Sequence, residues 1–332
     1  MSKTILVTGG AGYIGSHACK ALAAAGYAPV AYDNLIYGHR EAVRWGPLIE
    51  ADLADRERLA EALARHKVAA IMHFAAFAYV GESMTKPEIY FRNNVVNTLG
   101  LLDAMLAAGV RHIVFSSTCA TYGTPERVPI TEDTPQRPIN PYGQTKLAFE
   151  HALADYAAAY GLGYAALRYF NAAGASPDGG IGEDHEPETH LVPLALQAVQ
   201  GVRPPLTVFG TDYPTPDGTC VRDYVHVDDL AEAHLLALEK IEAGQGLCLN
   251  LGTGRGHSVR EVVRACEEVT GKPVPLREGP RRAGDPPALV AAADRANQVL
   301  GWRPRYTDLR QTVETAWNWH RSHPKGYGDR RP

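Results

Sequence analysis

The sequence has 332 residues, of which 45% are hydrophobic and 21% are charged, and its formal net charge is −4. This length suffices for about two domains with a large core, and a slightly acidic chain has no general attraction for nucleic acid or an anionic membrane. No apolar run approaches the ~20 residues that span a bilayer, and the first residues lack the apolar core of a secretory signal. The five cysteines are scattered and form no C-x-x-C pair, so we expect reduced thiols and a cytoplasmic location.

The first half of the chain alternates short apolar runs with longer helical stretches. Five runs predict buried strands: Ile5–Thr8, Pro29–Tyr32, Ala70–Phe74, His112–Ser116 and Ala165–Tyr169. Four stretches have helical periodicity: Ser16–Ala25, Arg56–His66, Tyr90–Ala108 and Lys146–Tyr160. This alternation predicts right-handed βαβ units and therefore an α/β fold, a Rossmann-type doubly wound parallel sheet with helices on both faces.

The pattern changes after about residue 172. The segments Ala175–Glu188 and Val202–Gly218 are rich in Gly, Pro and Asp, which predicts long ordered loops. Val225–Leu238 predicts a helix and Cys248–Leu251 a short strand. We therefore expect the chain to return to the first domain in this region.

A second, smaller domain is predicted toward the C-terminus. Ser258–Thr270 predicts a helix in which Ser258 is the N-cap and Glu261 its capping-box partner. From Pro324 onward the residues predict a loose tail. We therefore predict a Rossmann domain that comprises residues 1–172 and a return segment at about 225–252. The smaller C-terminal α/β domain comprises residues 173–224 and 253–332.

Residues 9–15 read Gly-Gly-Ala-Gly-Tyr-Ile-Gly, between the first predicted strand and the first predicted helix. A tight turn that lets the backbone approach a pyrophosphate needs residues without a Cβ, and a helix N-terminus presents N–H groups and a positive dipole end to the phosphates. Gly9, Gly12 and Gly15 have the spacing G-x-x-G-x-x-G. In this strand–turn–helix context the motif favours a dinucleotide site over a plain turn.

Two acidic residues follow the next strands. Asp33 ends the second predicted strand, where a carboxylate accepts hydrogen bonds from both ribose hydroxyls and repels a 2′-phosphate. NAD is therefore favoured over NADP, with a helix cap as the alternative role of Asp33. Asp52 and Leu53 follow the third strand region, and we expect them to hold the adenine.

Tyr142 and Lys146 form a Y-x-x-x-K pair at the start of a predicted helix. Residues four apart share a helix face, so the ammonium should favour the phenolate and bring a phenol with a pKa near 10 toward the range of a base. The alternative is a plain pair on a helix surface. Thr118 lies just beyond a predicted strand, at the edge where ligands bind. It can bridge a substrate hydroxyl and Tyr142, which favours the catalytic interpretation.

With these residues the sequence resembles the extended short-chain dehydrogenases/reductases and, among them, the UDP-glucose (UDP-galactose) 4-epimerase family. The matching stretches span nearly the whole chain: Thr8–His17, His73–Ala76, Val80–Ser83, Phe115–Gly123, Pro141–Lys146, Arg168–Asn171, Gly210–Asp229 and Arg281–Asp285.

The resemblance implies an isomerase of galactose metabolism that inverts C4 of a UDP-sugar. Tyr142 would take the proton of the 4-hydroxyl while hydride passes to a permanently bound NAD, and the 4-keto sugar would then receive the hydride on its other face. Thr118 stands where the family has a serine that relays the proton, and Lys146 would also hold the nicotinamide ribose. The NAD is recycled, so no second substrate is needed.

The resemblance also implies the binding residues. The cofactor set is Gly9, Gly12, Tyr13, Ile14, Gly15, Asp33, Asn34, Asp52, Leu53, Phe74, Ala75, Ala76, Asn94, Ser116, Tyr142, Lys146 and Phe170. The UDP-sugar set is Thr118, Tyr142, Asn171, His190, Leu191, Val208, Phe209, Arg222, Tyr224, Arg282, Asp285 and Leu289. The two arginines in the second set suit a diphosphate, because a guanidinium makes bidentate contacts with phosphate oxygens.

Several departures from the family pattern bear on the reaction and the substrate. Related 4,6-dehydratases carry an Asp-Glu pair where this chain has Cys119 and Ala120, so dehydration is disfavoured. Ala78 replaces a lysine that several members have. Leu289 lies at the position that gates the sugar pocket, where a tyrosine restricts the size of the sugar and a small residue admits N-acetyl groups. Leucine is intermediate in size. UDP-GlcNAc therefore stays open as a substrate. The stretches Thr118–Thr121 and Glu188–Leu191 resemble exopolysaccharide-type epimerases and plant UDP-arabinose 4-epimerases, so UDP-xylose/UDP-arabinose also stays open. His190 replaces an asparagine; the sequence shows no partners that would make it a metal ligand, and we expect no metal.

Two further expectations complete the sequence-based picture. A redox-sensing NAD-binding regulator is the non-enzymatic alternative, and the intact Thr118, Tyr142 and Lys146 argue against it. By resemblance, the helices Tyr90–Ala108 and Lys146–Tyr160 would join two copies of the chain in a homodimer.

Overall fold

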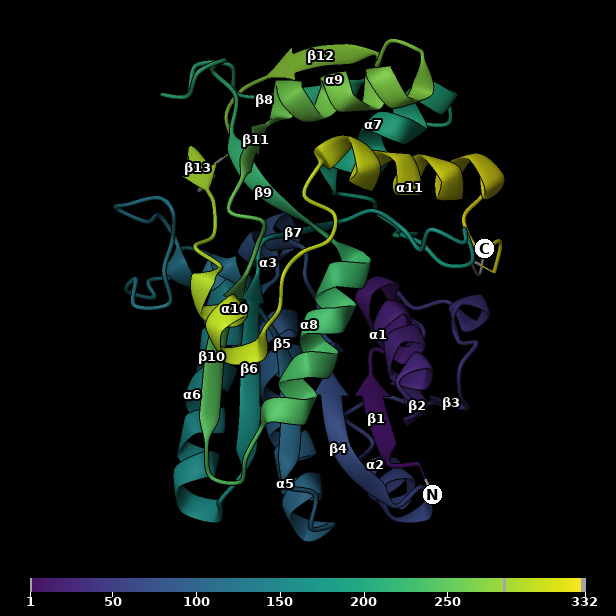
Figure 1. The fold of residues 1–332 in the computed structure, drawn as a ribbon, viewed down its shortest axis with the longest axis vertical. Coiled ribbons are helices and arrows are strands. Elements are labelled where there is room, and N and C mark those ends of the chain that lie inside the picture. The colour runs from purple at the N-terminus through teal and green to yellow at the C-terminus, as the bar shows by residue number, and fades with distance from the viewer. Residues whose placement is uncertain (1, 283–284, 330–332) are drawn as a thin grey trace.

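A parallel sheet of seven strands forms the larger part of the computed structural model, which describes residues 2–282 and 285–329 (Figure 1). The strand order is β10-β6-β5-β4-β1-β2-β3, and every neighbouring pair is parallel. The strands are β1 (Thr4–Thr8), β2 (Ala28–Asp33), β3 (Leu48–Glu50), β4 (Val68–His73), β5 (His112–Thr118), β6 (Gly163–Tyr169) and β10 (Gly246–Leu251). The predicted Rossmann-type α/β fold is confirmed, and the strand order reverses at β1, where such sheets bind ligands.

Helices cover both faces of this sheet, which explains why its strands are apolar on both sides. On one face Leu59, Leu102 and Phe149 belong to one buried cluster; on the other, Leu22, Leu230 and Leu300 belong to a second. The first group comes from α2 (Arg56–Arg65), α5 (Thr98–Ala107) and α6 (Pro141–Tyr160), and the second from α1 (Tyr13–Ala24), α8 (Val227–Lys240) and α10 (Asp294–Leu300).

The helix predicted over Tyr90–Ala108 is interrupted by a π-helical segment. After α3 (Val80–Thr85), the chain forms α4 (Pro87–Phe91), the π segment η2 (Arg92–Asn97) and then α5. Such segments are frequent at functional sites. Here the segment carries Asn94, whose amide bonds to the loop that follows β4.

A smaller domain lies beyond the carboxyl edge of the large sheet (Figure 1). It contains a sheet in which β9 pairs with β7, β11 and β13, and the two-stranded pair β8–β12. Its elements are β7 (Asn171–Ala173), α7 (Leu191–Gln200), β8 (Leu206–Phe209), β9 (Val221–His226), β11 (Gly256–Ser258), α9 (Val259–Thr270), β12 (Leu276–Gly279), β13 (Ala288–Leu289) and α11 (Leu309–Ser322). The capping box predicted at Ser258 and Glu261 is confirmed, because each side chain accepts a hydrogen bond from the other residue's N–H.

Two predicted elements of this region are corrected by the structure. The predicted loop Val202–Gly218 contains strand β8, which pairs with the distant β12. The predicted helix Val225–Leu238 begins later, because Val225 and His226 belong to strand β9 and α8 starts at Val227. In both cases the local structure depends on pairing with a strand far along the chain, and the sequence of the segment itself does not reveal that partner.

The predicted loose tail is wrong for the residues after Pro324 that the structure describes. The ring of Tyr327 stacks on His39, and its N–H donates to Asp184 at 2.9 Å. His39 also bonds to Asp329 at 2.6 Å. An aromatic side chain and a histidine–carboxylate contact thus attach this segment to the larger domain; residues 330–332 lie outside the described residues.

Candidate active site

The glycine-rich turn between β1 and α1 leaves room for a phosphate. Gly9 has a φ of +73°, and a Cβ on Gly15 would lie 2.1 Å from the Gly9 carbonyl oxygen. The first intrahelical bond is donated by Ser16 to Gly12 at 3.0 Å, so the preceding N–H groups, those of Tyr13, Ile14 and Gly15, need another partner. The first turn of α1 has no acidic residue. This cradle fits the pyrophosphate of NAD.

Asp33 lies at the end of β2 with its carboxylate beside the turn. Its Oδ2 accepts from the N–H of Ala11 at 3.0 Å and its Oδ1 from that of Leu35 at 2.9 Å. Burial raises the pKa of Asp33, and these two bonds oppose the shift. A carboxylate has about four acceptor positions, so it retains capacity for ribose hydroxyls. Asp33 closes a strand, and its alternative role as a helix cap is wrong.

Two of the residues expected near the adenine are hydrogen-bonded to each other. Asn34 donates from Nδ2 to Asp52 at 2.7 Å, and the other Asp52 oxygen accepts from the N–H of Ala54 at 2.8 Å. Leu53 is buried and packs in the core. A contact of Leu53 with adenine would therefore involve its backbone.

The loop after β4 continues this edge of the sheet. The N–H groups of Phe74 and Ala75 both donate to the carbonyl oxygen of Thr8, at 2.8 and 3.0 Å, and Ala76 follows. Farther along, Asn94 accepts from the N–H of Phe77 and donates to its carbonyl oxygen, each at 2.9 Å. The loop is thereby held against the Gly-rich turn on one side and η2 on the other.

The structure brings Thr118, Tyr142 and Lys146 together at the carboxyl end of β5. The Thr118 side chain lies close enough to the phenol of Tyr142 to favour its ionised form. Lys146 lies 5.9 Å from the centroid of the Tyr142 ring and donates from Nζ to the carbonyl oxygen of Ser116 at 2.9 Å. Asn140 starts the helix that carries two of these residues, because its side chain accepts from the N–H of Gly143 at 2.8 Å.

The pKa shifts correct one expectation. Burial raises the pKa of Tyr142 well above its ordinary value, and the nearby Thr118 side chain opposes this only in part. Burial lowers the pKa of Lys146 to about 7, opposed by Glu150. The protein chain alone therefore does not bring the phenol into the range of a base, because burial and the neighbouring Tyr169 disfavour the anion more than Thr118 favours it.

A buried ion pair behind β5 was missed from the sequence. Arg168 donates to Glu150 from Nε at 3.0 Å and from a terminal nitrogen at 2.6 Å, and Ser117 also hydrogen-bonds to Glu150. The pair joins β6 to α6 behind the catalytic residues. The available signal was the position of Glu150, four residues after Lys146 on the same helix face.

Several residues expected to bind the UDP-sugar gather where β9 and β13 pair. Arg222 forms an ion pair with Asp285, and in the parallel register it stands opposite Leu289. Leu289 packs against the buried cluster that contains Phe170 and Cys119. Burial raises the pKa of the Cys119 thiol to about 12, as suits a small core residue rather than a nucleophile.

The remaining residues of this set lie around the smaller domain. Asn171 pairs with Tyr224 in the register of β7 and β9, and Tyr224 is buried in the core of this domain. The guanidinium of Arg282 lies 4.2 Å from the centroid of the Phe209 ring. Val208 is buried, so it can reach a ligand only through its backbone. Of the expected stretch 281–285, residues 283 and 284 lie outside the described residues.

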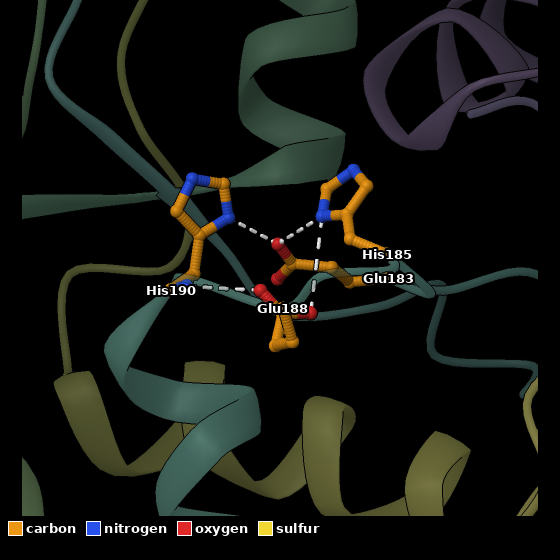
Figure 2. A group of neighbouring side chains, drawn as sticks. All are labelled: Glu183, His185, Glu188 and His190. Carbon is orange, nitrogen blue, oxygen red and sulfur yellow. Dashed lines mark hydrogen bonds and ion pairs between the residues drawn. The ribbon is translucent and has the colours of Figure 1, made fainter. Parts of the chain in front are cut away.

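His190 has partners that the sequence did not reveal. It precedes Leu191, the first residue of α7, and its Nδ1 contacts the Glu183 carboxylate. His185 and Glu188 complete a four-residue group (Figure 2). The expectation that His190 lacks metal-ligating neighbours is wrong, because the loop between β7 and α7 folds back on itself.

Contacts between the histidines and the carboxylates strongly shift the pKa values in this group. Burial alone would lower the pKa of His185, but contacts with Glu183 and Glu188 outweigh burial and raise it to about 10. Burial raises the pKa of Glu183, whereas His190 and His185 lower it to well below its ordinary value. The carboxylates thus hold negative charge in a buried position.

Comparison with known proteins agrees with this geometry. Residues 5–252 match the NAD dependent epimerase/dehydratase family. The chain is 56% identical over 326 residues to a UDP-glucose 4-epimerase of Rhizobium meliloti, covering 98% of this chain and 99% of the relative.

Two solved structures are similar along almost their whole length. A UDP-glucose 4-epimerase of Brucella ovis in complex with NAD has a TM-score of 0.92 at 56% identity, covering 95% of this chain and 98% of the other. One from Stenotrophomonas maltophila with bound NAD and formylated UDP-arabinopyranose has a TM-score of 0.93 at 43% identity, covering 97% and 99%. With the glycine-rich turn, Asp33 and the Thr118–Tyr142–Lys146 group in place, the chain belongs to the NAD dependent epimerase/dehydratase family and, within it, to the UDP-glucose 4-epimerases.

Proposed function

We propose that the protein is an isomerase that reversibly inverts C4 of UDP-glucose and UDP-galactose, with NAD as a bound prosthetic group. The observation that carries the proposal is the proximity of Thr118 to Tyr142, beside Lys146, at the carboxyl edge of the large sheet. A phenol, a hydroxyl relay and a buried ammonium are the groups needed to remove and return a hydroxyl proton.

Each of the three side chains has a distinct task in this account. Thr118 passes the proton of the sugar 4-hydroxyl to the neighbouring Tyr142, and Tyr142 holds it until the reverse transfer. NAD bound at this edge would supply the reversible hydride transfer at C4. Lys146 holds the nicotinamide ribose, and its positive charge together with that of the oxidised cofactor opposes the effect of burial on the Tyr142 phenol.

The cofactor residues form a continuous band along the sheet edge. The N–H groups at the start of α1 bind the pyrophosphate, and Asp33 binds the adenosine ribose and disfavours a 2′-phosphate. Ser116, whose hydroxyl lies 2.6 Å from that of Tyr169, contributes next to Lys146. The loop from Phe74 to Ala76 and Asn94 line the opposite side.

The sugar nucleotide is held by the smaller domain. Arg222 and Arg282 bind the diphosphate, Asp285 a ribose hydroxyl, and Asn171 and His190 contribute polar contacts. Leu289 borders the sugar, and its moderate size leaves UDP-GlcNAc open as a further substrate. A pentose also stays open, because the similar Stenotrophomonas maltophila protein holds a UDP-arabinopyranose derivative.

We further propose a cytoplasmic homodimer that serves galactose metabolism. None of the described helices is long and apolar enough to cross a membrane. Phe91 on α4 and Val96 on η2 are exposed, at 39% and 54%, and Tyr160 at the end of α6 is 55% exposed. These apolar side chains fit a helix-to-helix contact between two copies.

The amount of NADH formed distinguishes the proposed epimerase from a dehydrogenase that oxidises the sugar. Purified protein carrying NAD is mixed with excess UDP-glucose, and NADH is followed by its absorbance. An epimerase releases no stoichiometric NADH, because the hydride returns to the sugar. NADH formed in proportion to the UDP-glucose consumed would contradict the proposal.

A further inference from the structure

The loop between β7 and α7 gathers four metal-ligating side chains apart from Thr118, Tyr142 and Lys146, and one of the four, His190, is also among the proposed sugar-nucleotide residues. Glu183, His185, Glu188 and His190 each direct one ligand atom inward, and these four atoms lie within 4.8 Å of one another (Figure 2). The spacing E-x-H-x-x-E-x-H places all four in one short loop. We propose that this loop binds a zinc ion.

The distances within the group suit a tetrahedral ion. His185 Nδ1 lies 3.1 Å from Glu183 Oε1 and 3.8 Å from Glu188 Oε2, and His190 Nδ1 contacts the same Glu183 oxygen. Zinc binds nitrogen and oxygen at about 2.0–2.2 Å, which puts neighbouring ligand atoms of a tetrahedron roughly 3.3–3.6 Å apart. These two separations lie on either side of this range, the contact between His190 and Glu183 is shorter, and all four ligand atoms lie within 4.8 Å of one another. The side chains would therefore rotate about an ion bound between them.

Glu188 gives an independent indication of a ligand. Its Oε1 accepts from the N–H groups of Thr189 and His190, at 2.7 and 2.9 Å, and these bonds fix the carboxylate. Its Oε2 is buried, accepts no hydrogen bond from the described residues and faces into the group. Among the described residues its ion-pair partner is His185 Nδ1, at 3.8 Å, which is beyond hydrogen-bonding distance. A bound cation would satisfy this buried oxygen directly.

The donor set decides which cation fits. Two imidazole nitrogens and two carboxylate oxygens match zinc, whereas magnesium and calcium prefer oxygen ligands alone. Two carboxylates also balance a divalent charge when both imidazoles are neutral. Four protein ligands close the tetrahedron, so the ion is structural.

The neighbours of the loop show what such an ion would stabilise. The ring of His185 makes an edge contact with that of Tyr13 in the first turn of α1, at 6.1 Å between centroids. Trp319 on α11 donates from Nε1 to the carbonyl oxygen of Glu183 at 3.2 Å. The ion would therefore hold the loop between the Gly-rich turn and the smaller domain, and fix His190 at the start of α7.

Zinc binding by untagged, full-length protein tests the proposal. After treatment with a chelator and its removal, zinc alone is titrated in by calorimetry, with cobalt as a spectroscopic probe of tetrahedral geometry. We expect one zinc ion per chain, a tetrahedral cobalt spectrum and a higher thermal unfolding midpoint with zinc. Absence of stoichiometric zinc binding would overturn the proposal.

Conservative variants locate the site. Glu188→Gln and His185→Gln keep the side-chain size and should weaken zinc binding at least about 100-fold and abolish the zinc-dependent rise in the unfolding midpoint. His151→Gln removes an exposed histidine on α6 and should leave both unchanged. Zinc affinity that is equal in wild type and in both loop variants would show that the metal binds elsewhere. Retained far-UV circular dichroism identifies the variants that are folded.

Discussion

Lys146 donates a hydrogen bond from Nζ to the main-chain oxygen of Ser116 at 2.9 Å. This bond joins α6 to the end of β5 and places the ammonium 5.9 Å from the Tyr142 ring centroid, next to the strand that ends in Thr118. The Lys146 side chain is buried, so its Nζ has a fixed position rather than that of a mobile surface group. A backbone contact thus sets the position of Lys146 relative to the end of β5.

Tyr142→Phe should remove nearly all epimerase activity and leave NAD bound, because only the ionisable oxygen is lost. We expect kcat to fall by about 10²–10⁴-fold, the usual contribution of a general acid–base group. Steady-state kinetics and the NAD content of the purified variant measure the two effects. Tyr27→Phe, directly before β2 at the amino edge of the sheet, is the matched control and should behave as wild type. Wild-type turnover by Tyr142→Phe would show that another group moves the proton.

Arg222→Lys should weaken binding of the UDP-sugar more than it slows turnover. Lysine keeps the charge but cannot make the bidentate contact of a guanidinium, so we expect KM to rise about tenfold, or about 1.4 kcal/mol, with a smaller change in kcat. Arg281→Lys alters an exposed arginine that pairs with Asp212 and serves as control. An equal response of the two variants would remove Arg222 from the diphosphate site.

Leu289→Tyr should narrow the tolerance for N-acetylated sugars. A larger side chain beside Arg222 and Phe170 takes up space next to the sugar, so the ratio of kcat/KM for UDP-GlcNAc to that for UDP-glucose should fall. Leu276→Tyr, at an exposed position on β12, introduces the same residue away from the proposed site. An unchanged ratio in Leu289→Tyr would show that this residue does not border the sugar.

Four buried histidines should make the fold sensitive to mild acid. Burial lowers the pKa of His17 and His234 to about 4 and that of His73 and His226 to about 3, against about 6.5 in an unfolded chain. Between about pH 6.5 and 4 the unfolded state then binds more protons, so the free energy of unfolding decreases as pH falls, by up to about 1.4 kcal/mol per pH unit for each histidine. Asp228, whose pKa burial raises to about 6, opposes this in part.

Urea unfolding at a series of pH values between 7 and 4 measures the effect. His234→Gln should flatten the slope by roughly one proton, whereas His151→Gln, at an exposed position, should not. A free energy of unfolding that stays constant over this range would contradict the assignment of these histidines as buried and neutral.

The sequence predicted the large sheet well because its strands are apolar on both faces and alternate with amphipathic helices. It also predicted the proximity of Thr118, Tyr142 and Lys146, since a strand end and a helix start meet at one edge in this fold. Strand β8 was missed because its partner, β12, lies about 70 residues away along the chain.

The group around His190 shows a second limit of sequence reasoning. Glutamate and histidine in a polar loop are commonly solvated, and nothing in their spacing tells whether the loop turns inward. The bonds from Thr189 and His190 to Glu188 decide that it does. The pKa of Tyr142 was misjudged for a related reason, because burial is a property of the packed structure.

Product analysis is the most direct test of the central claim. Purified protein is incubated separately with UDP-glucose, UDP-GlcNAc and UDP-xylose, without added NAD, and the sugar nucleotides are separated by chromatography. We predict that UDP-glucose is converted into its C4 epimer and that the three yields rank the substrates. No epimer from any of the three, even after NAD is supplied, would contradict the account.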